Sequence, residues 1–298
     1  MKWEKLGHVF VPDGSLEWMK THAANPVVRP MGDDIVRVYF SGRSEQNQAH
    51  ISWLEIDMND PLTVQRLCDK PVLSPGDVGL FDDSGVSMGC FAEINGKTHL
   101  FYLGWNLGVT VPWRNSIGAA VEQDDGSFVR VSKAPILDRC HADPYSISYP
   151  WILQDDKEFH IWYGSNLAWG DAQEDMAHLM KYARSDDGLN WNREGHVALP
   201  FKDEGEYAMS KPCVIKDPDG FKMWYSYRGL AYRIGYAESK DGKTWVRKDE
   251  EVGISVSEEG WDSETVEYPC VFDHKGSRYM LYNGNAYGLT GFGMAKLK

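Results

Sequence analysis

Short aromatic-rich segments, separated by polar turns that often contain glycine, run along the whole chain and predict β-strands. Five of these segments resemble one another: VRVYFSG (36–42), HLFYLGW (99–105), FHIWYGS (159–165), FKMWYSY (221–227) and RYMLYNG (278–284). Aligning their central residues gives spacings of 63, 60, 62 and 57 for Phe40, Leu103, Tyr163, Tyr225 and Tyr282. A strand with a Pro-x-Val/Ile pattern precedes most copies, and a third strand follows each one. The chain is therefore an internal repeat of about sixty residues.

A strand repeat of this length is typical of a β-propeller. The sequence thus predicts an all-β fold, a single five-bladed propeller over 1–298. The expected blades are approximately 20–74, 75–138, 139–200, 201–254, and 255–298 plus 1–12. The last repeat stops after three strands, and MKWEKLGHVFVP (1–12) matches LNWNREGHVALP (189–200). We therefore expect the N-terminal strand to complete the last blade and close the ring, which removes an open sheet edge.

The composition of the chain limits which binding partners and which cellular compartment we expect. The chain has 298 residues, with 31 basic against 44 acidic side chains and a net charge of −13, which disfavours nucleic acids and anionic membranes. No apolar run approaches the roughly 20 residues of a membrane span, and no secretory signal is expected at the start. Five cysteines without CxxC spacing indicate buried thiols in a reducing cytoplasm. No cofactor is expected; a Ca²⁺ in the central channel would suit the fold, but no motif demands it.

Acidic residues gather just before the first strands of four blades, where a propeller brings side chains to its axis. They are Asp82, Asp83, Asp143, Glu206, Asp262, Glu264 and Glu267. Glycosidic cleavage needs one protonated carboxyl for the leaving oxygen and a second carboxylate as base or nucleophile. The candidate catalytic residues are Glu267, Asp83, Asp143, Glu206 and Glu264. For each acid, a solvated loop or a hydrogen bond to the backbone is the structural alternative.

Glu267 breaks the pattern of the inner strands. It lies two residues before Pro269, where the other repeats carry Ala24, Ser87, Ser148 and Ser210. A glutamate in place of a small residue at an axial position is costly unless it is used or paired. The same argument makes Lys211, which follows the axial Ser210, a candidate binding residue. Neighbouring positions on a strand point to opposite faces, however, which favours a structural role for Lys211.

The loops after the second strands open on the same face and supply candidate ligand-binding residues. Two loops, 106–114 and 166–177, are long and aromatic. Trp105 precedes the first, and Trp113 and Trp169 lie within them; each either stacks on a sugar or packs in the core. The candidate binding residues are His22, Arg43, Trp105, Tyr145, Trp169, Tyr207, Lys211 and Arg228.

The chain resembles the five-bladed propeller glycoside hydrolases of families 43, 32, 62, 68 and 130. The turns SDDGLNW (185–191) and SKDGKTW (239–245) resemble the S-x-D-G-x-x-W turns common in sugar-processing propellers. VEYPCVFDHKGSRYMLYNG (266–284) resembles a family 43 pattern whose Glu is the general acid, and this implies that role for Glu267. The first-blade Asp of families 43 and 32 is replaced by Asn25 before Pro26. Their second-blade Asp is replaced by Gly89-Cys90.

Two further resemblances bear on function. NPVV (25–28) resembles the first blade of the family 130 phosphorylases, which bind phosphate with basic side chains. That resemblance implies a phosphate cluster at His22, Arg43, Lys211 and Arg228. Over its whole length the chain resembles uncharacterised propeller proteins found with surface-polysaccharide genes, which implies a sugar context.

The sequence thus leaves several hypotheses open. The first is a cytoplasmic glycosidase-like enzyme acting on a small, nucleotide-linked or lipid-linked sugar. The second is a phosphorylase or glycosyl-transferring enzyme, favoured by the missing first-blade Asp, because phosphorolysis needs only one acid. A non-catalytic carbohydrate-binding propeller is the third, and a protein scaffold is the weakest.

Overall fold

A computed structural model describes residues 1–170 and 176–298, and its regular structure is almost entirely β. The twenty strands are β1 (Trp3–Phe10), β2 (Thr21–Gly32), β3 (Ile35–Arg43), β4 (Ala49–Asp57), β5 (Asp60–Leu67), β6 (Gly85–Ile94), β7 (Lys97–Leu107), β8 (Trp113–Glu122), β9 (Phe128–Arg130), β10 (Ile147–Asp155), β11 (Glu158–Ala168), β12 (Ala177–Ser185), β13 (Val197–Leu199), β14 (Ala208–Asp217), β15 (Gly220–Arg228), β16 (Tyr232–Ser239), β17 (Trp245–Arg247), β18 (Glu267–His274), β19 (Ser277–Asn283) and β20 (Phe292–Leu297). A 3-10 turn (Asp249–Glu251) and the short α1 (Asn285–Gly288) complete the described elements.

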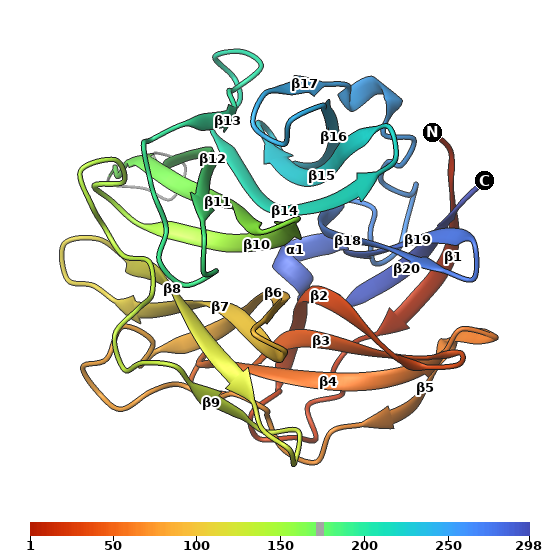
Figure 1. Ribbon diagram of the computed structural model, residues 1–298. Helices are drawn as coiled ribbons and strands as arrows, with labels where there is room; N and C mark the ends of the chain where they lie inside the picture. Colours follow the sequence, from red (N-terminus) through yellow and green to blue (C-terminus); the bar gives the residue numbers. More distant parts are fainter. Residues whose placement is uncertain (171–175) are drawn as a thin grey trace.

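Most consecutive strands pair antiparallel, and the strands form two eight-stranded sheets and one four-stranded sheet. Each eight-stranded sheet consists of two runs of four strands, which meet at one parallel residue pair, Ala49 with Gly85 or His178 with Ala208. The four-stranded sheet has the order β1-β20-β19-β18, so the first strand of the chain pairs with the last one, as the match between 1–12 and 189–200 predicts. Strands β2, β6, β10, β14 and β18 lie nearest the centre, around α1 (Figure 1).

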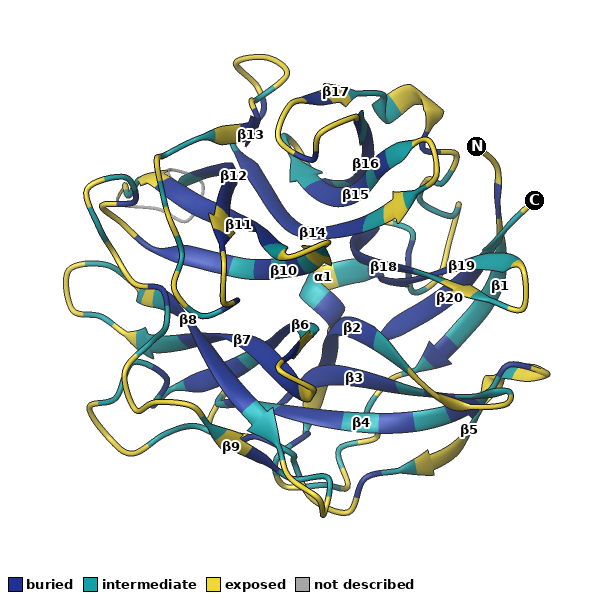
Figure 2. Ribbon diagram, viewed as in Figure 1, coloured by how far each residue is buried: buried dark blue, intermediate teal, exposed yellow. Residues whose placement is uncertain are grey.

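The aromatic second strands build the core, as the sequence predicts. Tyr39, Tyr102, Trp162, Tyr225 and Tyr282 are fully buried. The strands are mostly buried along their length and the connecting turns are exposed (Figure 2). Trp151, on the inner strand β10, packs against all four hydrophobic clusters. It thereby connects the sheets near the centre of the molecule.

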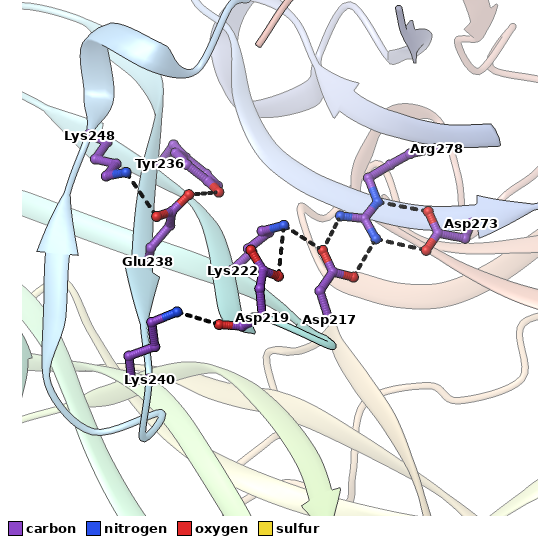
Figure 3. Close-up of polar contacts among 9 residues, drawn as sticks. All are labelled: Asp217, Asp219, Lys222, Tyr236, Glu238, Lys240, Lys248, Asp273 and Arg278. Atoms are coloured by element: carbon purple, nitrogen blue, oxygen red, sulfur yellow. Dashed lines mark hydrogen bonds and ion pairs between the residues drawn. The ribbon is translucent and has the colours of Figure 1, made fainter. Parts of the chain in front are cut away.

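Ion pairs link neighbouring sheets at the periphery. Arg278 of β19 donates to both carboxylate oxygens of Asp217 on β14, at 2.9 and 2.8 Å, and also binds Asp273 (Figure 3). Lys222 pairs with Asp217 from the other side at 2.8 Å. This network fixes the β14–β15 turn against β18 and β19. Its charges are partly exposed, so each pair stabilises the fold by about 1 kcal/mol or less.

The strand register shifts in all five inner strands, and in four of them the shift coincides with a proline. The residue directly before the proline has a left-handed backbone, with φ of 57° at Asn25, 44° at Tyr149, 49° at Lys211 and 54° at Tyr268. The ladder skips these positions; on β10, for example, pairing passes from Ser148 to Trp151. Proline cannot donate a ladder hydrogen bond, so it fits a bulge. Bulges re-aim side chains and are frequent beside active sites.

Candidate functional site

A pocket of about 410 Å³ opens where the inner strands meet. The inner strands contribute Asn25, Ser87, Ser148, Tyr149, Ser210 and Tyr268. The second and third strands, with α1 and neighbouring turns, contribute Arg43, Trp105, Trp113, His178, Tyr232 and Tyr287, among others. Because three of the pre-proline bulge residues line the pocket, the bulges aim side chains into it. Polar and aromatic groups that converge in one concave site are typical of ligand binding.

Carboxylates are missing from the wall of this pocket. Among the residues that the structure describes, no Asp or Glu lines it. Arg43 brings a guanidinium and His178 an imidazole. A hydrolase that uses two carboxylates needs them roughly 5–10 Å apart on either side of the glycosidic bond. The described wall does not supply that pair.

Glu267 lies directly behind the pocket wall. It begins β18, opposite Asn283 of β19, and its side chain is 1% exposed. Its Oε1 accepts the backbone N–H of Tyr287 at 3.0 Å and a longer contact from the Thr265 hydroxyl at 3.4 Å. Oε2 is buried and has no hydrogen-bond partner among the described residues. Burial raises the pKa of Glu267 to about 8, so this carboxyl holds its proton at neutral pH.

The turn α1 connects Glu267 to Arg228. Tyr287 gives its backbone N–H to Glu267, and its hydroxyl accepts a 2.6 Å hydrogen bond from Arg228. Ala286 and Tyr287 both have positive φ, 56° and 58°. Two consecutive left-handed residues cost roughly 1–2 kcal/mol each, and such strain clusters at functional sites. Gly288 completes the turn, because a Cβ there would lie 2.9 Å from Ala24.

His178 is held as a neutral hydrogen-bond acceptor. Its Nδ1 lies 2.6 Å from the carbonyl oxygen of Met209 and must donate to it, since a carbonyl cannot donate. The Nε2 atom of the neutral ring therefore keeps its lone pair. Burial, helped by the nearby Arg228, lowers the pKa of His178 to about 4. The ring is consequently uncharged throughout the physiological range.

Three polar atoms of pocket-lining residues are buried without a partner in the described part of the chain. They are Oδ1 of Asn25, Nδ2 of Asn166 and Oγ of Ser210. Buried polar groups are nearly always hydrogen-bonded, and an exception indicates a missing partner. A ligand rich in hydroxyl groups would satisfy all three atoms.

Asp143 and Glu206 are engaged in ion pairs. Asp143 accepts the hydroxyls of Tyr163 and Ser165 and pairs with Lys181 at 3.0 Å and Arg193 at 3.2 Å. Burial alone would raise the pKa of Asp143, but the Ser165 hydrogen bond and Lys181 outweigh it and hold the pKa below its usual value. Glu206 forms a two-point pair with Arg247, at 2.6 and 2.8 Å.

The buried aspartates follow one structural pattern. The hydroxyl of a second-strand tyrosine donates to an aspartate that also pairs with a basic residue. The examples are Tyr102–Asp82–Arg130, Tyr163–Asp143–Lys181, Tyr225–Asp249–Arg247 and Tyr282–Asp262–Lys5. The first repeat has Phe40, which carries no hydroxyl, at the position that Tyr163, Tyr225 and Tyr282 occupy in their repeats. Most of the acidic clustering before the inner strands thus has a structural role.

Asp83 and Glu264 belong to loops. Asp83 accepts the N–H of Gly79 and the hydroxyl of Ser84, both nearby in sequence. Glu264 is exposed, and its backbone N–H donates to Asn285. Neither residue lines the pocket.

The structure brings some of the predicted binding residues to the pocket. Arg43 and Trp105 line it, whereas Arg228 and Tyr207 lie behind Tyr287, with Arg228 5.6 Å from the ring centre of Tyr207. Trp169 packs edge-on against the pocket residue Trp113 at 5.4 Å. Residues 171–175 of the predicted loop 166–177 lie outside the described residues.

Three predicted binding residues lie elsewhere. Lys211 is fully buried and donates to the carbonyl of Gly89 at 2.6 Å, and burial lowers its pKa. Tyr145 is 38% exposed and does not line the pocket. His22 contacts Thr21, and burial together with Arg43 lowers its pKa to about 4.

Several pocket residues were absent from the sequence-based set: Tyr149, His178, Tyr232, Tyr268 and Tyr287. Tyr149 and Tyr268 could have been found, because both precede a proline at the position that Asn25 and Lys211 occupy in their repeats. His178 and Tyr287 have no such signal.

Within 1–170 and 176–298, the His, Cys, Asp and Glu side chains form no group of three or more that could hold a metal ion. Across those same residues, no helix is both long and apolar enough to span a bilayer.

Comparison with solved structures identifies the fold. The chain superimposes on a glycoside hydrolase with a TM-score of 0.76 and 18% identity, covering 98% of this chain and 90% of that one. A thermostable family-43 glycoside hydrolase matches with a TM-score of 0.67 and 17% identity, over 93% and 88% of the two chains. The structural neighbours are thus propeller-type glycoside hydrolases, and the chain has their propeller-like, all-β fold.

Sequence comparison gives both near and distant relatives, while no family model matches the chain. A 1,2-beta-oligomannan phosphorylase of Thermoanaerobacter sp. (strain X514) is 26% identical over 185 residues, 57% of this chain and 61% of that protein. The uncharacterized protein MT1551 of Mycobacterium tuberculosis (strain CDC 1551 / Oshkosh) is 44% identical over 298 residues, all of both chains. The chain therefore belongs to the same family as MT1551.

Proposed function

We propose that this protein is a glycoside-active enzyme that uses Glu267 as its single general acid and an external phosphate as nucleophile. The observation that carries the proposal is a buried, protonated carboxyl directly behind a pocket whose described wall has no second carboxylate. An enzyme that recruits an anion from solution does not need a carboxylate nucleophile. The distant relationship to an oligomannan phosphorylase supports this choice over hydrolysis.

The proposed reaction is a direct displacement. A phosphate oxygen bonds to the anomeric carbon while the glycosidic C–O bond breaks, and the leaving oxygen takes the proton of Glu267. The carboxylate then regains a proton from the phosphate O–H or from water. A general acid works best when its pKa lies near the operating pH, which suits a pKa of about 8. Because α1 covers Glu267, the proposal requires α1 to shift when the glycoside binds.

Arg43 is the proposed contact for phosphate. Arg43 lines the pocket together with Trp105 and Trp113. Guanidinium groups bind phosphate through paired, charge-assisted hydrogen bonds. Arg228 adds positive charge behind Tyr287, while His178 stays neutral and accepts a substrate hydroxyl.

The test is product analysis with a 1,2-β-linked mannobiose, in the presence and absence of phosphate. Phosphorus NMR should show a mannosyl phosphate with the wild-type protein, and none with Glu267→Gln. Release of free mannose at the same rate without phosphate would overturn the role of phosphate. Near wild-type turnover by Glu267→Gln would overturn the role of the acid.

A non-catalytic sugar-binding protein is the second candidate, because the Glu267 carboxyl is covered by α1. The same experiment separates the two functions when it is combined with calorimetry. Binding of the disaccharide without any product, at any phosphate concentration, would favour the binding protein.

We also propose that the protein is a closed, five-bladed propeller located in the cytoplasm. The runs of four strands, each joined to the next by at most one residue pair, support five blades with the boundaries expected from the repeats. The pairing of β1 with β20 supports a closed ring. Five free cysteines support a reducing cytoplasm.

A further inference from the structure

An exposed aliphatic turn lies at the mouth of the pocket. Leu107 ends β7 and Trp113 begins β8, and both side chains line the pocket. Val109 lies in the turn between them, which the N–H of Gly108 closes on the carbonyl of Pro112 at 3.3 Å. Leu107 is 72% exposed and Val109 fully exposed. Burial of such side chains by a ligand would be favourable.

The apolar surface continues onto the neighbouring loop. Trp169 packs against Trp113, and Met176 lines the pocket beside them. Leu167, which precedes Trp169 by two residues, is 41% exposed. Single exposed hydrophobic residues are ordinary on protein surfaces, whereas a contiguous group marks a binding site. We call Leu107, Val109, Trp113 and Trp169 the apolar strip.

Polar groups line the same pocket. Asn25, Ser41, Arg43 and Asn47 come from β2, β3 and the following turn. The pocket lining therefore combines polar with apolar chemistry. Asn25 and Arg43 suit hydroxyl and phosphate groups, while Leu107 and Val109 of the apolar strip are exposed to solvent.

We propose that the apolar strip binds an aliphatic chain attached to the sugar, so that the substrate is a glycoside with an alkyl or lipid aglycone. This inference rests on the proposed function, which places the sugar in the pocket. The strip shares Leu107 and Trp113 with the pocket, so a ligand in the pocket meets it directly. Tryptophan side chains by themselves would also suit a sugar ring, which stacks on their flat face. Leu107 and Val109 have no flat face, and they would remove water from sugar hydroxyl groups without replacing its hydrogen bonds. A protein partner needs an interface of roughly 1,000 Å² or more, much larger than this turn.

The test compares binding of methyl and octyl β-D-mannoside by calorimetry, below the concentration at which the octyl compound forms micelles. Each methylene removed from water contributes about 0.8 kcal/mol, or roughly fourfold in affinity. Partial burial of the chain should make the octyl glycoside at least about tenfold tighter than the methyl glycoside. Leu107→Ser combined with Val109→Ser should bring this ratio close to one, with the melting temperature unchanged.

Leu230→Ser is the matched control. Leu230 is equally exposed and lies in the turn between β15 and β16, which corresponds to the Val109 turn in the next but one repeat. This variant should keep the chain-length preference. Equal affinity for both glycosides in the wild-type protein, or an unchanged preference in the double variant, would overturn the inference. These outcomes are distinct from those that test the proposed function. Product analysis tests the enzymatic reaction, whereas the ratio of octyl to methyl glycoside affinity tests only the apolar strip.

Discussion

The backbone N–H of Tyr287 donates to Oε1 of Glu267 over 3.0 Å. This contact makes Oε1 the acceptor and leaves Oε2, which has no partner among the described residues, to carry the proton. The same residue binds Arg228 through its hydroxyl. The turn α1 therefore holds the acid in one orientation and connects it to Arg228 through Tyr287.

The raised pKa of Glu267 makes stability depend on pH. The folded protein binds this proton more tightly than the unfolded chain, whose pKa is near 4.5, so the stabilisation is complete below pH 4.5 and is lost as pH rises toward about 8. We expect wild-type protein to lose stability relative to Glu267→Gln between pH 5 and pH 8. Urea unfolding of both proteins across this range measures the difference. If the free energies of unfolding of the two proteins change in parallel with pH, Glu267 is not protonated in the native state at neutral pH.

The substitution Asp143→Asn should lower the free energy of unfolding more than it affects the catalytic step. It leaves Lys181 and Arg193 without their buried anion, and breaking a buried ion pair costs about 3 kcal/mol. Asp83→Asn, in an exposed loop, should change the unfolding free energy by less than about 0.5 kcal/mol. Chemical denaturation checks both values. A stable Asp143→Asn protein that binds sugar but has no turnover would instead give Asp143 a catalytic role.

His178 should not titrate in the physiological range. With a pKa lowered to about 4 by burial, its ring should stay neutral from pH 5.5 to 8, with the proton on Nδ1. Nitrogen NMR of the imidazole gives both the tautomer and the titration. A midpoint near 6.5 would mean that the ring is solvated and does not hold the fixed acceptor described above.

Gly288→Ala should uncover Glu267. The new Cβ combines a φ of +88° with a 2.9 Å approach to Ala24, so α1 must move and admit water to the carboxyl. We expect the pKa of Glu267 to fall toward its ordinary value. Gly276→Ala is the control, because its φ is also positive, +76°, but no atom lies within 4 Å of its Cβ. If both variants leave the carboxyl pKa unchanged, α1 does not control its solvation.

The aromatic repeat predicted the strands and their core, and the match between Trp3 and Trp191 predicted that β1 pairs with β20. Strand periodicity is local information, which sequence carries well. Glu267 was also visible from sequence, because a charged residue replaced a small one at a repeated axial position.

The roles of the other acids could not be assigned from spacing alone. Asp143 occupies an axial segment, yet its partner Lys181 lies 38 residues away and meets it through the fold. One internal clue was present: an aspartate accompanies the second-strand tyrosine in the later repeats, and Phe40 has none. His178 and Tyr287 join the pocket through a third strand and an irregular turn, whose geometry no repeat encodes.

The most direct test of the account is the pKa of Glu267 itself, measured by carbon NMR of protein labelled at the glutamate carboxyl and assigned with Glu267→Gln. The account predicts one carboxyl that remains protonated at pH 6.5 and titrates near pH 8. A Glu267 signal that titrates near 4.5 would contradict it, because the pocket would then have no acid able to protonate a leaving group at neutral pH.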